Sequence, residues 1–104
     1  MTTPLTLDTD HDADGRPLLA AHGEIDLTNC DSFASALDAA VAESAPVVVD
    51  LSDVEYLDSG AINALFTHAE HLRLIVRPVL MPALRICGLT ELATIDTAPD
   101  LGRM

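Results

Sequence analysis

Aromatic residues, basic residues and long apolar runs are all scarce in this sequence. Its 104 residues include no Trp, one Tyr and two Phe, although 49% are apolar, so the core must consist mainly of Leu, Val, Ile and Ala. No apolar run approaches the ~20 residues that cross a membrane as a helix, and the N-terminus lacks the basic start and apolar stretch of a secretory signal. We therefore expect a soluble, cytoplasmic protein without direct membrane insertion.

The scarcity of basic residues also limits the partners. Five Lys and Arg residues face seventeen Asp and Glu, for a formal net charge of −12. Such a chain repels phosphate backbones and anionic head groups, which argues against nucleic acid as a partner. Cys30 and Cys87 stand alone, without the close spacing of a redox or zinc motif, and we expect both to be small buried hydrophobes.

The order of predicted elements indicates a single α/β domain over residues 1–104. Residues 4–10 and 16–26 are predicted strands joined by an acidic turn. Apolar residues then recur at three- and four-residue steps, which predicts a helix that Thr28 or Asn29 caps. Residues 47–51 read Val-Val-Val-Asp-Leu, an apolar strand that helices cover on at least one side.

The second half of the chain continues this alternation. A second helix is predicted over about residues 60–72, with Leu72 on its apolar face, and a strand follows directly as Leu-Arg-Leu-Ile-Val. Leu80, Leu84 and Cys87 mark a short third helix that Gly88 ends, and residues 90–95 are predicted as a last helical turn. Strands alternating with helices favour a sheet with helices packed on it.

Two patterns resemble metal sites but lack ligands. Residues 10–15, Asp-His-Asp-Ala-Asp-Gly, match the opening of a calcium loop, whose twelfth position requires a bidentate Glu and here holds Ala21. His68 and His71 are spaced to share a helix face, but a zinc site needs a third or fourth ligand. We expect no metal and no cofactor, and we place both histidines on the surface of the second helix.

Ser59 lies where the central apolar strand gives way to the second helix, and three roles suit a serine there. A nucleophile elbow needs Gly-x-Ser-x-Gly, whereas residues 57–61 read Leu-Asp-Ser-Gly-Ala, and the downstream histidines are on the helix that Ser59 opens. The sequence therefore does not indicate an enzyme. A helix N-terminus favours an anion such as a phosphate, and Asp58 or Ser59 could equally be the helix cap, so these two roles remain open.

Three motifs in order resemble the STAS domain family, whose single-domain members are anti-sigma factor antagonists. They are Gly-Glu-Ile-Asp at residues 23–26, the stretch from Val47 to Gly60, and Leu-Arg-Ile-Cys-Gly-Leu-Thr-Glu-Leu at residues 84–92. The resemblance implies a four- or five-stranded mixed sheet with helices packed on one side. It also implies a partner, an anti-sigma factor with a serine-kinase-like fold, whose binding releases a sigma factor and whose kinase activity switches the antagonist off.

The same resemblance implies where the partner binds and where a phosphate would go. Aligned without a gap, Asp58 matches the family Asp, Ser59 the first hydroxyl position and Gly60 the phosphate acceptor, so the usual acceptor hydroxyl is missing. Ser59 remains the candidate for phosphorylation, and Asp26, Asp58, Ser59 and Gly60 form the expected partner surface. Helix propensity predicts that Gly60→Ser costs no stability unless the site lies under a close contact.

An alternative from the same family is a STAS-like accessory subunit of a membrane ATPase complex that transports lipids. Members of that kind have the same fold and need no phosphorylation, which suits glycine at position 60.

Overall fold

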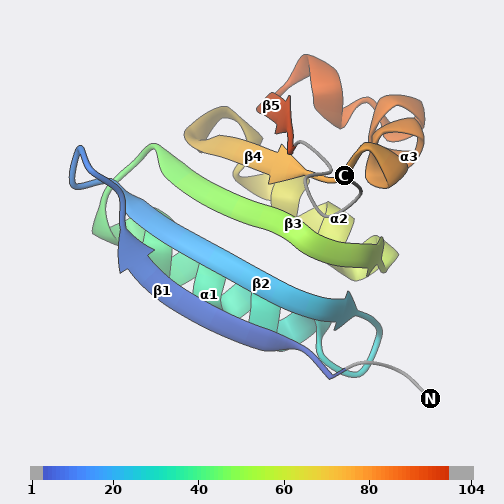
Figure 1. The fold of residues 1–104 in the computed structure, drawn as a ribbon, viewed down its shortest axis with the longest axis horizontal. Coiled ribbons are helices and arrows are strands. Elements are labelled where there is room, and N and C mark those ends of the chain that lie inside the picture. The colour runs from blue at the N-terminus through green and yellow to red at the C-terminus, as the bar shows by residue number, and fades with distance from the viewer. Residues whose placement is uncertain (1–3, 99–104) are drawn as a thin grey trace, which may run out of the picture.

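One mixed sheet of five strands organises the chain in the computed structural model, which describes residues 4–98. The strands follow one another across the sheet in chain order, from β1 to β5 (Figure 1). The strands are β1 (Thr6–His11), β2 (Pro17–Ile25), β3 (Val47–Leu57), β4 (Leu72–Val76) and β5 (Thr94–Thr97). The helices are α1 (Cys30–Glu43), α2 (Ser59–Thr67) and α3 (Met81–Cys87), with 3₁₀ turns η1 (Ala69–His71), η2 (Pro78–Leu80) and η3 (Leu89–Glu91).

The connections determine the strand directions. β1 and β2 form an antiparallel hairpin, as a short turn allows. β2, β3, β4 and β5 are parallel to one another, because each of these connections contains a helix that returns the chain to the same end of the sheet. The carboxyl ends of β2 and β3 therefore lie side by side, with Ile25 paired with Leu57.

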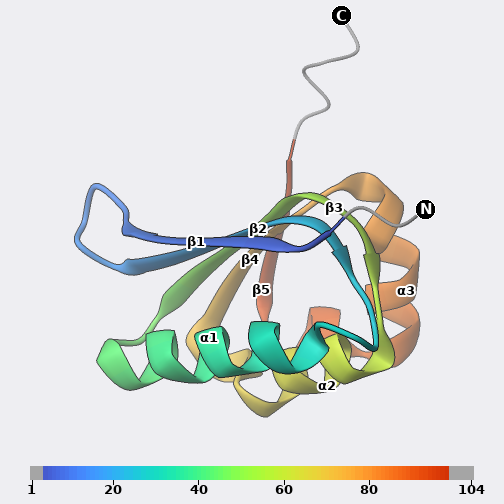
Figure 2. The same ribbon diagram turned by 90° about the horizontal axis from the view of Figure 1, so that it is seen from below.

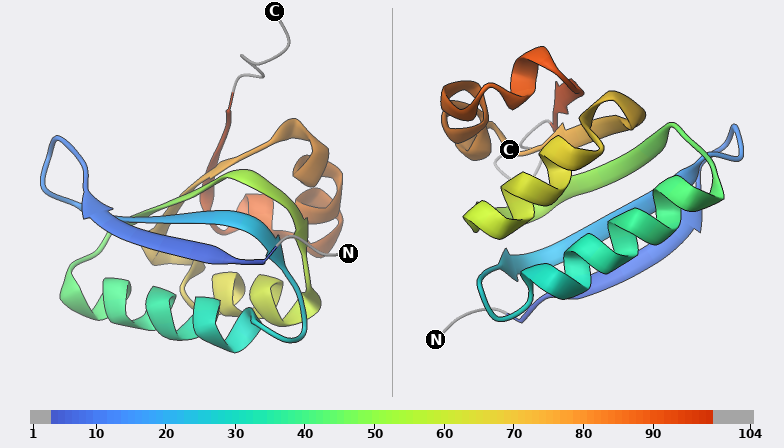
Figure 3. Two further views of the ribbon diagram at one scale, coloured as in Figure 1. Left: turned by 60° about the horizontal axis from the view of Figure 1, so that its bottom comes forward. Right: turned by 180° about the vertical axis from the view of Figure 1, so that it is seen from behind.

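Helices α1 and α2 cover one face of the sheet, and the opposite face carries no helix among the described residues (Figures 2 and 3). Alternate residues of β3 explain this layer: Val47, Val49 and Leu51 are fully buried under the helices. Phe33 and Leu37 of α1 and Leu65 of α2 close the core from the other side. The predicted aliphatic core is confirmed, with Phe33 as its largest fully buried side chain.

The predicted fold class, a four- or five-stranded mixed sheet with helices packed on one side, is confirmed, and the sheet has five strands. The hairpin, the strand at 72–76 and a third helix are also where the sequence placed them. That helix ends at Gly88, whose φ of +88° is the left-handed conformation that favours glycine. Cys30 is buried as expected, whereas Cys87 is only partly buried.

Two sequence predictions about secondary structure are wrong. α2 ends at Thr67 rather than near Leu72, because the chain tightens into η1 and Leu72 is already the first residue of β4. Leu72 is therefore buried as part of the sheet and not as part of the apolar face of α2. Residues 90–95 were predicted as helix, but η3 ends at Glu91 and β5 begins at Thr94. This edge strand is mostly exposed, so its sequence lacks the apolar alternation that identifies a strand.

Among the described residues, no helix is both long enough and apolar enough to cross a membrane.

Candidate functional site

The candidate site lies at the carboxyl ends of the neighbouring strands β2 and β3. Asp26 follows β2 and Asp58 follows β3, and the Asp58 backbone N–H donates to the Ile25 carbonyl at 2.8 Å. Helices α1 and α2 begin within a few residues of these two aspartates, so both helix N-termini are brought to the same end of the sheet (Figure 3). The structure thus brings together all four residues of the predicted partner surface.

Asp58 is the cap of α2. Its Oδ1 atom accepts a hydrogen bond from the Gly60 backbone N–H at 2.9 Å, which satisfies one of the free amides at the helix N-terminus and places a negative charge at the positive end of the helix dipole. Of the two capping residues left open by the sequence, the structure selects Asp58.

Ser59 is the first residue of α2 and is exposed. Its hydroxyl lies 3.5 Å from Asp58 Oδ1, a long and weak contact. The Ser59 hydroxyl is therefore open to solvent and available to a partner.

Gly60 lies against the first residue of α1. A Cβ atom built on Gly60 would be 2.9 Å from Cys30 Sγ and 3.5 Å from Cys30 Cβ. Cys30 is buried, and its thiol donates weakly to the Leu27 carbonyl at 3.7 Å. Because the two helix N-termini approach each other so closely, position 60 has no space for a side chain unless Cys30 moves. Sequence reasoning missed this contact, since nothing in the motif relates residue 60 to residue 30.

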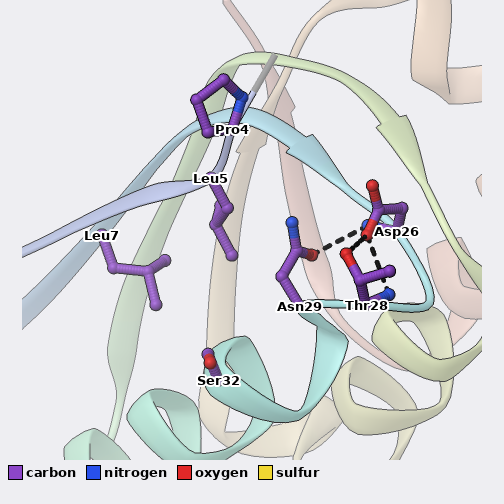
Figure 4. Close-up of a pocket in the computed structure, with 7 residues that line it drawn as sticks. All are labelled: Pro4, Leu5, Leu7, Asp26, Thr28, Asn29 and Ser32. Atoms are coloured by element: carbon purple, nitrogen blue, oxygen red, sulfur yellow. Dashed lines mark hydrogen bonds between the residues drawn. The ribbon is translucent and has the colours of Figure 1, made fainter. Parts of the chain in front are cut away.

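Asp26 organises the loop between β2 and α1 (Figure 4). Its Oδ1 atom accepts from the Thr28 hydroxyl at 2.6 Å and from the Thr28 backbone N–H at 2.9 Å. The Thr28 hydroxyl holds the pKa of the Asp26 carboxyl below its ordinary value, because its hydrogen bond favours the ionised form. The Asp26 backbone N–H in turn donates to Asn29 Oδ1 at 2.9 Å.

This network corrects the predicted cap of α1. Asn29 occupies the capping position, but its side chain makes no capping hydrogen bond. Its amide instead links the loop to the strand, through Oδ1 to Asp26 and through Nδ2 to the Glu24 carbonyl at 3.0 Å. Thr28 also uses its hydroxyl on Asp26. Both side chains therefore hold the shape of the loop.

An open hollow of about 450 Å³ lies beside this loop. It separates the start of β1 from the start of α1, with leucines on one wall and the Asp26 loop on the other (Figure 4). Its lining residues are Pro4, Leu5, Leu7, Asp26, Thr28, Asn29 and Ser32.

Two large apolar side chains on the same end of the sheet were not identified from the sequence. Leu27, directly after Asp26, is 78% exposed, and Tyr56, two residues before Asp58, is 50% exposed. The available signal was a large apolar side chain within two residues of each of the aspartates that follow β2 and β3. Leu27 and Tyr56 extend the acidic site into a mixed surface of the kind found at protein interfaces. We call Asp26, Leu27, Tyr56, Asp58 and Ser59 the cap surface.

The histidines are engaged elsewhere. His68 was placed on the surface of the second helix, but its side chain is only 20% exposed and its Nε2 atom lies 2.6 Å from Asp38 Oδ1 of α1. His71 lies in η1 near Glu70. Among the described residues, no group of three or more His, Cys, Asp and Glu side chains is arranged to hold a metal ion.

The mixed sheet, the helices on one face and the Asp-Ser-Gly cap at the β3–α2 junction define a STAS-type α/β domain. The sequence model described as "Mlab, STAS domain" matches residues 9–94, and the chain belongs to this STAS family. None of the curated proteins compared with the chain matches it.

Solved structures agree with this assignment. An anti-sigma factor antagonist from Mycobacterium paratuberculosis is 27% identical, with a TM-score of 0.77 over 88% of this chain and 85% of that one. Bacillus SpoIIAA in its phosphorylated form is 13% identical, with a TM-score of 0.60 over 93% of this chain and 95% of that one. A protein from Shewanella loihica with a SpoIIAA-like fold is 13% identical, with a TM-score of 0.62 over 96% and 89%. The last two likenesses show the fold alone.

Proposed function

We propose that this protein is an anti-sigma factor antagonist: a regulatory binding protein that docks on a kinase-like anti-sigma factor through the cap surface and so releases a sigma factor. The observation that carries the proposal is the composition of the cap surface. It combines an exposed serine at a helix N-terminus with two exposed apolar side chains and two carboxylates. The similarity to the mycobacterial antagonist supports the same function.

Glycine at position 60 makes the antagonist constitutive in this proposal. In the gapless alignment the acceptor hydroxyl would be on residue 60, and there a side chain meets Cys30 Sγ at 2.9 Å. The kinase then has no hydroxyl at the position that it usually phosphorylates, and ATP does not dissociate the complex of antagonist and anti-sigma factor. Ser59 remains exposed one residue earlier, so this hydroxyl serves contact with the partner rather than phosphate transfer.

Calorimetric titration against the kinase-like anti-sigma factors of the same genome tests the function. Wild-type protein should bind one of them and release its sigma factor in a competition assay. Leu27→Ser should weaken this binding about tenfold, because it removes an exposed apolar contact from the cap surface. Ser35→Ala, a change at an exposed position in the middle of α1, is the control and should bind like wild type. Absence of binding to every candidate would refute the proposal.

A second candidate, an accessory subunit of a membrane transport ATPase complex that moves lipids, is favoured by one observation. Gly60 leaves the first turn of α2 without the acceptor hydroxyl, and a docking subunit has no need of that group. Co-purification of the tagged protein with membrane-bound ATPase subunits, lost in Leu27→Ser, would support this function over the first. A set of partners without any such subunit would exclude it.

A further inference from the structure

Helix α3 is apolar on both of its faces, although it lies on the outside of the domain. With η2 it forms one continuous helical segment from Pro78 to Cys87. Leu80 and Leu84 are buried against the core, as an amphipathic helix requires. The other side is also apolar: Val79, Pro82, Ala83 and Ile86 are exposed and recur at three- and four-residue steps. We call these four residues the α3 outer face.

The side chains of the α3 outer face are unusually exposed for apolar residues. Ile86 is 88% exposed and Val79 is 63% exposed, and they are among the five large hydrophobic side chains that are exposed in the described residues. A helix that is apolar all round is ordinarily buried on all sides, and a clustered apolar patch on a surface marks an interaction site. Core packing explains Leu80 and Leu84 but not Ile86.

Charge distinguishes this segment from the rest of the chain. Residues 77–90 contain two arginines and no acidic residue, whereas the whole chain has seventeen acidic residues and five basic ones. Arg85 is exposed beside Ile86 and forms no ion pair with the described residues. A second copy of the protein would bring arginine toward arginine if two such faces met. An apolar surface rimmed by carboxylates complements this face.

The topology places helix α3, which carries the α3 outer face, at the same end of the sheet as the cap surface. α3 follows the carboxyl end of β4, the parallel neighbour of β3, whose carboxyl end leads to Asp58. The views agree, since α3 and the start of α2 lie at one end of the domain (Figures 1 and 2). A single partner of ordinary size can therefore reach both surfaces.

We propose that the α3 outer face is the second half of the partner interface, and that it accepts an apolar surface of the anti-sigma factor rimmed by Asp or Glu that face Arg85. This inference rests on the proposed function and adds a partner chemistry to it. The cap surface carries the carboxylates of Asp26 and Asp58, whereas the exposed Arg85 lies beside the α3 outer face, so the two surfaces together orient the partner as well as hold it. Only a partner with the opposite order of charges can satisfy both.

Titration of the purified anti-sigma factor with three variants tests the inference. Ile86→Ser should weaken binding about tenfold or more by removing the most exposed apolar side chain of the face. Arg85→Glu should weaken it about fivefold, with a larger loss at low salt, because rim charges act mainly on association. Arg16→Glu makes the same charge change in the hairpin turn at the other end of the sheet and should leave affinity within about twofold. Thermal unfolding should show all three variants folded.

The outcomes separate the two proposals. If Leu27→Ser weakens binding while Ile86→Ser and Arg85→Glu match wild type, the α3 inference is refuted and the proposed function stands. If wild type binds no anti-sigma factor, both are refuted. If sedimentation shows a dimer that Ile86→Ser dissociates, the face is occupied by a second copy and the inference is refuted. If Arg85→Glu and Arg16→Glu weaken binding equally, the effect comes from the net charge of the protein and not from the position of Arg85, and the proposed carboxylate rim is refuted.

Discussion

Gly60→Ala should destabilise the protein although it replaces a poor helix former with the best one. Gly60 is not among the glycines with positive φ, so backbone strain does not enter. Helix propensity alone predicts a gain of about 1 kcal/mol. Against it, the new Cβ lies 2.9 Å from Cys30 Sγ, well inside the ~3.5–4.0 Å of a favourable contact between carbon atoms.

The sign depends on whether Cys30 can move. Its side chain is buried and its thiol already faces the Leu27 carbonyl, so relief requires a new rotamer or a shift of α1. Overpacking of this kind costs about 1–3 kcal/mol, and the net effect should be a loss of about 1 kcal/mol. For a domain of this size that lowers Tm by roughly 4–8 °C. Gly60→Ser, which the helix propensity rule treats as harmless, should lose as much for the same reason.

A double-mutant cycle isolates the contact. In Cys30→Ala the sulfur is gone and the nearest remaining atoms lie at 3.5 Å, an ordinary separation, so adding Gly60→Ala should now be neutral or stabilising. Urea unfolding of the four proteins should give a coupling free energy of at least about 1 kcal/mol. Ser59→Ala, an exposed change one residue away, is the control and should not couple to Cys30. Additivity of Cys30→Ala and Gly60→Ala within about 0.5 kcal/mol would refute the reasoning.

Three further predictions address phosphorylation and pH. Incubation of wild type with its anti-sigma kinase and ATP should leave the intact mass unchanged, and stoichiometric phosphate on Ser59 would show that the gapless register is wrong. His11 Nε2 lies 2.7 Å from Glu43 Oε2, and this hydrogen bond raises the pKa of His11 above its ordinary value. The stabilisation by the His11–Glu43 pair is full below the unfolded pKa of about 6.5 and is lost as pH rises through the folded pKa of His11. The stability advantage of wild type over Glu43→Gln should therefore shrink from pH 5.5 to 8.5, and a constant difference would contradict this. The Thr28 hydrogen bond lowers the pKa of Asp26, so the stabilisation by this carboxylate is present above its unfolded pKa and is lost as pH falls through its folded pKa. The stability difference between wild type and Asp26→Ala should therefore be smaller in acid than near neutrality. A difference that does not change with pH would contradict the role of the ionised carboxylate.

The structure gives Asp26 a role in the loop between β2 and α1 that its motif did not predict. The sequence predicts Asp26 as a residue of the partner surface. The structure adds hydrogen bonds to Thr28 and Asn29, which make it a support of the loop as well. The sequence placed Thr28 and Asn29 next to Asp26, but it predicted them as caps of α1, because Thr and Asn side chains suit both a loop and a helix cap.

The sequence by itself determined the parts of this protein that local periodicity and composition encode. Amphipathic steps located α1, a run of valines located β3, and Gly88 located the end of α3. The excess of acidic residues argues against nucleic acid as a partner, which stays a prediction. The tertiary structure alone decided where α2 gives way to β4, that an exposed edge strand follows η3, and that Cys30 lies against Gly60. The physical reason is that these features arise from contacts between residues distant in the chain, and such contacts leave no period in the sequence.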